Sequence, residues 1–233
     1  GETDYVVGAV GYPMFEREYT ERGSSVTLQQ LNLSEEEKVR LIDLLNFNLR
    51  PENREYRYNF LYNNCSTMAR DKVEEALTMD VKTSQDSVQT SYRAILHQYT
   101  DGYPWLQFGI DCLLGIEADQ MISVRKQMFA PEYLQAYTAT MQLKGEQGSY
   151  PYVMSEEVVA PIAPQESVFS FPLTPLQAMI LLLLITACIC TLEFLVESRQ
   201  WWFDIFMFIV QGLMGCVVAF PFFCSDHPAA DSN

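Results

Sequence analysis

Histidine is scarce in this chain: among 233 residues only His97 and His227 carry an imidazole. A catalytic zinc ion is normally held by three protein side chains, with histidine prominent among them. The nearest grouping of possible ligands, Cys224, Asp226 and His227, contains a single histidine. The sequence therefore predicts no metal site, and no other motif in it suggests a bound cofactor.

Basic residues are also few. Fifteen Lys and Arg face 30 Asp and Glu, which gives a net charge of −15. Nucleic-acid binding needs a basic face to contact phosphates, so we expect no nucleic-acid partner. The same charge argues against simple electrostatic docking on an anionic membrane surface. The acidic excess lies mostly in residues 1–172, whereas residues 173–223 are almost uncharged.

Cysteine is too sparse for a disulfide framework. Four of the six cysteines lie in or beside apolar segments: Cys188, Cys190, Cys216 and Cys224. Only Cys65 and Cys112 remain in the polar part of the chain. Two lone cysteines in a domain of this size are weak evidence for a bridge, even in an oxidising compartment.

Long apolar runs are present, and there are two of them. Residues 173–196 and 201–223 are each long enough for a helix that crosses a bilayer, which needs about 20 apolar residues. Only Glu197–Gln200 separates them. We therefore predict a transmembrane helical hairpin over residues 173–223. A linker over residues 166–172 would join it to the polar domain. Residues 224–233 would begin the next connection, on the same side of the membrane as the polar domain.

The polar part, residues 1–165, mixes strand and helix patterns and indicates a helix-rich α+β domain. Residues 26–33 alternate as in a half-buried strand, and Ser34 and Glu37 form a capping box for a helix that ends before Pro51. We expect this helix to bury its apolar residues: Val39, Leu41, Ile42, Leu44 and Leu45. Residues 56–62 should be extended. Prolines 104 and 131 should open two further helices.

Residues 57–77 carry the strongest functional signal. An alternating pattern ends at Asn64, and apolar residues at helical spacing begin after Cys65. With Asn64 or Ser66 as N-cap, Cys65 lies at a helix N-terminus, where backbone N–H groups and the helix dipole favour a thiolate. Cysteine acyl-transfer enzymes present their nucleophile in this way. The alternative is a buried structural cysteine.

Several stretches together resemble one family, the Lnb-type proteins of Gram-negative bacteria. The stretches are Thr3–Gly8, Leu31–Glu35, Pro51–Arg54, Tyr58–Cys65, Arg70–Asp71, Gly102–Gly115 and Ser225–Pro228. The resemblance spans nearly the whole chain, and the motifs occur in order.

This resemblance implies a circularly permuted papain-like domain in the periplasm, followed by several transmembrane helices in the inner membrane. The implied activity is lipoprotein N-acylation, in which an acyl chain moves from a phospholipid donor to the N-terminal amine of a lipoprotein. Cys65 matches the family's cysteine and would carry the acyl group as a thioester. The loop at Glu197–Gln200 would then face the cytoplasm.

The family's histidine motif should lie ahead of Gly1, so we expect the chain to be an N-terminally truncated part of a longer protein and to be inactive alone. Asn64 and the Cys65 N–H are candidate oxyanion donors, against a simpler role in a turn and helix cap. His227 is a second-rank candidate for acid–base work, against a polar turn that ends the second span.

Two other functions remain open at this point. One is a papain-like cysteine peptidase or amidase that acts on cell-wall peptides, although a soluble substrate would not explain the two apolar runs. The other is a non-catalytic, membrane-anchored binding module in which Cys65 is merely buried. A histidine motif upstream would favour an enzyme.

Overall fold

The structure is a computed structural model that describes residues 4–79, 81–82, 89–145, 148–160, 171–199 and 201–224. The chain divides into two compact units, and each is described by itself. The cysteine unit comprises residues 2–91 and 121–168. The helical unit comprises residues 92–120 and 169–233.

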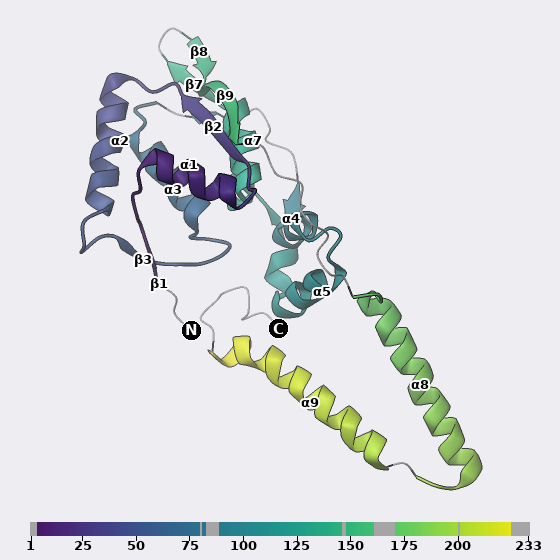
Figure 1. Cartoon of the computed structure of the whole chain (residues 1–233). Helices are drawn as coiled ribbons and strands as arrows, with labels where there is room; N and C mark the ends of the chain where they lie inside the picture. The colour runs from purple at the N-terminus through teal and green to yellow at the C-terminus, as the bar shows by residue number, and fades with distance from the viewer. Residues whose placement is uncertain are drawn as a thin grey trace. The chain divides into compact units, whose positions relative to one another are not determined.

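The cysteine unit confirms the expected mixture of strands and helices (Figure 1). Its strands are β1 (Asp4–Val6), β2 (Val26–Leu31), β3 (Glu55–Arg57), β4 (Val81–Lys82), β5 (Thr90–Ser91), β6 (Met121–Ile122), β7 (Gln142–Gly145), β8 (Gly148–Pro151) and β9 (Val153–Ala160). Its helices are α1 (Tyr12–Glu21), α2 (Glu35–Asn48), α3 (Cys65–Ala76), α6 (Val124–Gln127) and α7 (Pro131–Thr140).

The described strands form small antiparallel sheets, ordered β1-β3, β2-β9, β4-β7-β8 and β5-β6. The longest pairing joins β2 to β9, with Leu28 opposite Glu157, so it brings together segments more than 100 residues apart. A buried cluster packs nearby around Met128, Tyr137 and Leu143. This arrangement supports the α+β class, and the permuted papain-like topology stays a prediction.

Helix α2 begins where the sequence predicted. Ser34 and Glu37 cap each other's backbone N–H groups, and the helix ends before Pro51. The expected buried side is only partly right, because Leu41 and Leu44 are half-buried while the other predicted residues are not. Val39 and Ile42 are exposed, and the fully buried residue is Glu37.

Glu37 is buried because its carboxylate also accepts hydrogen bonds from the backbone N–H and the hydroxyl of Thr78. Desolvation raises the pKa of Glu37, but the hydrogen bonds from Thr78 and Ser34 outweigh it and leave the pKa below its usual value. The polar contact between α2 and the segment after α3 therefore decides which side of α2 faces inward.

The extended segment expected over residues 56–62 is shorter than predicted. Strand β3 ends at Arg57, and a tight turn follows in which the side-chain oxygen of Asn59 accepts hydrogen bonds from the N–H groups of Leu61 and Tyr62. Asn favours such turns because its side chain imitates a backbone carbonyl. The turn directs the chain into Asn64 and the start of α3.

The helical unit contains α4 (Tyr92–Tyr99), α5 (Pro104–Leu113), the short 3-10 helix η1 (Ile116–Asp119), α8 (Pro175–Val196) and α9 (Trp201–Cys224). Thr174 caps α8 through a box with Gln177. Among the described residues, α8 is the helix with both the length and the apolar composition needed to cross a membrane. In α9 the apolar stretch that qualifies, Trp201–Val217, is shorter. Both helices match the predicted ranges, while their pairing as a membrane hairpin stays a prediction.

Candidate functional site

Cys65 is the first residue of α3, and its side chain is exposed. Its neighbours Asn64, Ser66 and Thr67 are all buried. The predicted helix start is therefore confirmed, and the alternative of a cysteine enclosed by apolar side chains does not fit. The fold holds the residues around Cys65 in place and leaves its thiol accessible.

Asn64 supplies this rigidity as the N-cap of α3. Its side-chain oxygen accepts hydrogen bonds from the N–H groups of Ser66 and Thr67, at 2.9 and 3.0 Å. Its backbone N–H bonds to the Thr67 hydroxyl, and its carbonyl accepts from the N–H of Met68. Of the two caps that the sequence allowed, Asn64 is the one used.

The amide nitrogen of Asn64 is also engaged. It donates to the carbonyl oxygens of Phe60 at 2.9 Å and Phe129 at 2.8 Å, which fastens α3 to a loop 65 residues away. Both amide protons are thus committed, and the geometry suits positioning of Cys65 better than donation to an oxyanion. The Cys65 N–H differs: no residue in the described ranges accepts it, because the first N–H of a helix has no partner within the helix.

Two tyrosines, Tyr56 and Tyr58, lie near the cysteine, and Tyr5 packs against both of them. The Tyr5 and Tyr58 rings stack at 4.1 Å between centroids, and Tyr5 lies opposite Tyr56 in the β1-β3 pair. Burial raises the pKa of Tyr56 and of Tyr58, and the nearby negative charge of a Cys65 thiolate adds to the rise. Both phenols therefore stay neutral and keep an O–H donor near the thiol.

Sequence reasoning missed these tyrosines. Tyr56 and Tyr58 are two residues apart at the end of a strand, a spacing that puts both side chains on one face. That signal was available. Their closeness to Cys65 was not, because it depends on the turn at residues 59–63.

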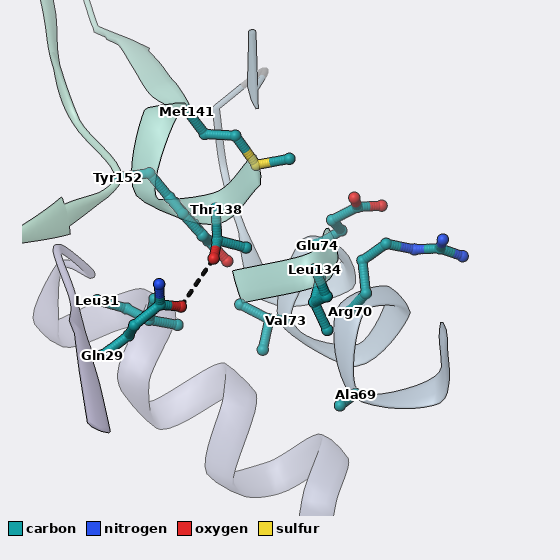
Figure 2. Close-up of a pocket in the computed structure, with 10 residues that line it drawn as sticks. All are labelled: Gln29, Leu31, Ala69, Arg70, Val73, Glu74, Leu134, Thr138, Met141 and Tyr152. Carbon is teal, nitrogen blue, oxygen red and sulfur yellow. Dashed lines mark hydrogen bonds between the residues drawn. The ribbon is translucent and has the colours of Figure 1, made fainter. Parts of the chain in front are cut away.

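A pocket of about 200 Å³ lies along α3. Figure 2 shows its lining from β2, α3 and α7 and from the residues directly after α7 and directly before β9: Gln29, Leu31, Ala69, Arg70, Val73, Glu74, Leu134, Thr138, Met141 and Tyr152. The walls are mainly aliphatic. Among the polar lining groups, the Thr138 hydroxyl donates to the Gln29 side-chain oxygen at 2.7 Å (Figure 2), while Arg70 and Glu74 pair with residues outside the pocket. Burial raises the pKa of Tyr152 to about 12, so its phenol is neutral there.

The pocket lies next to the cysteine along one helix. Cys65, Ala69 and Val73 follow each other at four-residue intervals, and such residues are neighbours on a helix surface, with about 5–6 Å between Cβ atoms. Ala69 is exposed and lines the pocket, although Cys65 itself does not. A group attached to the Cys65 sulfur could therefore extend over Ala69 into the apolar space.

Only one of the two histidines lies in the part of the chain that the structure describes. His227 lies outside the described residues. His97 is in the helical unit, where its Nε2 lies 2.8 Å from an oxygen of Asp111. Desolvation raises the pKa of Asp111, but hydrogen bonds from His97 and Arg93 outweigh it and hold the pKa below its usual value. No group of three metal-ligating side chains occurs within the part of the chain that the structure describes.

Comparison with known families identifies both parts of the chain. Residues 1–98 match the Lnb N-terminal periplasmic domain, and residues 165–233 match the Lnb transmembrane domain. The chain belongs to the Lnb family. It is a membrane protein with a periplasmic part, and Cys65 and Asn64 fall within the periplasmic match.

The Lnb family matches leave residues 99–164 between them, which include α5 and the pocket residues Leu134, Thr138, Met141 and Tyr152. No curated protein and no solved structure matches the chain.

Proposed function

We propose that this Lnb-family protein is a cysteine-dependent acyltransferase that moves an acyl chain from a membrane phospholipid to the N-terminal amine of a lipoprotein. The observation that carries the proposal is the exposed Cys65 at the first position of α3, with an apolar pocket one helical turn away. An enzyme that carries an acyl group on sulfur needs both features: an accessible nucleophile and a dry site for the chain.

The chemistry takes two steps. In the first, the Cys65 thiolate attacks the ester carbonyl of the phospholipid. The ester C–O bond breaks, the lysophospholipid leaves as an alcohol after gaining a proton, and a thioester remains on Cys65. In the second, the lipoprotein's α-amine attacks the thioester. An amide bond forms, the C–S bond breaks and the thiolate returns, while the amine proton passes to a base. Two such steps are each easier than one direct transfer.

Each step passes through a tetrahedral oxyanion that needs hydrogen-bond donors. The Cys65 N–H fits this role, since the three N–H groups after it are all held by Asn64. Asn64 then acts mainly by positioning Cys65. We propose that the base is a histidine outside the described residues. One candidate is the histidine motif that the family resemblance implies, and His227 is the second.

The pocket along α3 would hold part of the transferred acyl chain. Sites for drug-sized ligands usually measure about 300–1,000 Å³, so this pocket is too small for a whole phospholipid. Its aliphatic walls suit a stretch of hydrocarbon chain instead. On this account the headgroup and the rest of the lipid stay outside, at the membrane.

The proposal includes the finer parts of the architecture. The cysteine unit would be a permuted papain-like domain on the periplasmic side of the inner membrane. Helices α8 and α9 would form a transmembrane hairpin in a multi-pass protein, with residues 197–200 facing the cytoplasm. Phospholipid and lipoprotein are both held in the membrane, so a catalytic unit tethered there meets both substrates.

The reaction type is tested by product stoichiometry. Full-length protein in vesicles is supplied with phospholipid and a diacylglyceryl lipopeptide, and products are measured by mass spectrometry. Acyl transfer predicts equal amounts of lysophospholipid and N-acylated lipopeptide. A peptidase or amidase would release no lysophospholipid and would instead cleave a cell-wall peptide supplied in a parallel reaction. A binding module would give neither product, and either of these results would contradict the proposal.

Filling the pocket should change chain selection. Ala69→Trp places a large ring between Cys65 and the aliphatic walls. Transfer of long acyl chains should then fall about tenfold or more, because a single methylene in a hydrophobic pocket is already worth about 1–3 kcal/mol. Transfer of short chains should fall much less. The control is Ala69→Ser, which adds little volume. Equal losses for long and short donors in the tryptophan variant would refute the assignment of this pocket.

A further inference from the structure

Helix α5 exposes its large apolar side chains. None of its residues is buried, and its large apolar side chains Trp105, Leu106 and Leu113 are 40%, 55% and 46% exposed. Its only charged residue, Asp111, is less exposed than these side chains, at 33%, and its carboxylate pairs with residues of α4. A helix on the surface of a water-soluble protein normally has the opposite arrangement, with apolar side chains inward and charges outward.

The carboxylate of α5 is paired with side chains of α4. Asp111 accepts hydrogen bonds from Arg93 at 2.7 Å and pairs with His97 at 2.8 Å, and both partners come from α4. Arg93 also binds Asp119 and the Leu114 carbonyl. No carboxylate is left on the outer face of α5, whose exposed side chains are aromatic or aliphatic.

This face is continuous with the start of the membrane-spanning helix. The Trp105 indole N–H donates to the Leu173 carbonyl at 2.6 Å, and its ring meets Phe171 edge-on at 5.7 Å. Leu173 directly precedes Thr174, the N-cap of α8. Helix α5 therefore lies at the level where α8 begins, and it contacts α8 directly.

The end of a membrane span lies where hydrocarbon gives way to headgroups, and Trp and Tyr are enriched there because one end of each ring is apolar and the other can hydrogen-bond. Tyr103 and Trp105, at the start of α5, are 44% and 40% exposed. An exposed apolar face of this kind on a membrane protein needs a partner.

From this geometry we infer that α5 is an interfacial helix that inserts its outer apolar face, carried by Trp105, Leu106 and Leu113, between the headgroups and acyl chains of the phospholipid leaflet at which α8 begins. The partner is phospholipid, and not protein, because the face continues from α8, whose apolar window is not buried against any described residue. Both family matches leave α5 unassigned. The inference depends on membrane location and not on acyl transfer.

The paired carboxylate makes this placement physically reasonable. An unpaired charge at this depth would be costly, and ionisable groups in membranes are found facing protein and paired. Asp111 meets both conditions through Arg93 and His97. The helix can then present a continuous apolar surface to lipid while its carboxylate binds it to α4.

Photo-crosslinking tests the inference directly. A benzoyl-phenylalanine replaces Leu106 in the full-length protein, which is irradiated in native membranes and searched by mass spectrometry for a phospholipid adduct. Leu113, one heptad further on the same face, serves as a second position in case the first substitution disturbs folding. Leu183 of α8 is the positive control, and the exposed polar Gln98 of α4, in the same unit, is the matched control.

We expect phospholipid adducts at Leu106 and Leu113 at yields close to that of Leu183, and about tenfold above that of Gln98, because only the first three lie in lipid. Adducts to protein alone would mean that a second copy or another segment covers α5, and would overturn the inference. So would equal lipid yields at Leu106 and Gln98, or lipid adducts at Leu183 without any at either α5 position.

Discussion

Replacing Cys65 by alanine in the full-length protein should reduce lipoprotein N-acylation by about a thousandfold or more, since loss of a covalent nucleophile removes the whole two-step route. The thiol is exposed, so the change leaves no cavity in the core. The variant should therefore fold and insert as the parent does. Activity is measured as N-acylated lipopeptide formed per protein, at matched protein levels.

Two controls separate chemistry from structure in that experiment. Cys65→Ser keeps the size of the side chain but not the thiolate, so it should lose nearly as much activity as the alanine variant. Cys188→Ala changes a cysteine of α8, far along the chain from α3, and should stay near the parental rate. A Cys65→Ala protein that retains a tenth or more of the parental rate would contradict the assigned role.

Replacing Asn64 by alanine should have the largest effect on stability. The change removes the N-cap of α3, which alone costs about 0.5–2 kcal/mol. It also leaves the carbonyls of Phe60 and Phe129 without the donor that they now share, and buried groups that lose a partner cost about 1–3 kcal/mol. We expect a total near 3 kcal/mol, seen as a fall of about 10 °C in the thermal midpoint.

Asn63 offers a matched control beside it. Its amide makes one hydrogen bond, to the Arg57 carbonyl at 2.7 Å, and its side chain is less buried than that of Asn64. Asn63→Ala should lower the midpoint by only a few degrees. Asn64→Ser, which keeps a capping oxygen but loses the amide donors, should fall between the two. Equal midpoints for Asn63→Ala and Asn64→Ala would show that the bonds around Asn64 do not hold the site.

The local features of this protein follow from its sequence because local rules produce them. The Ser34 box, the helix start at Cys65 and the proline-led α5 and α7 each depend on a few adjacent residues, and each was predicted. Their signals are capping side chains and helical spacing of apolar residues, which no distant contact has overridden.

The non-local features could not be predicted in the same way. The inward side of α2 is set by the hydrogen bond between Glu37 and Thr78, which are 41 residues apart. Asn64 is anchored by the carbonyl of Phe129, which is 65 residues away. The pocket needs β2 and α7 on either side of α3, which depends on the pairing of β2 with β9. Apolar spacing shows that a helix has a buried face, but not which partner covers it.

The most direct test of the account looks for the acyl group on sulfur. Full-length protein is incubated with phospholipid but without a lipoprotein acceptor, digested, and analysed by mass spectrometry. We expect an acyl chain on the peptide that contains Cys65, removed by neutral hydroxylamine and discharged when a lipopeptide acceptor is added. An unmodified Cys65 during turnover, or an acyl group on another residue that is discharged in its place, would contradict it.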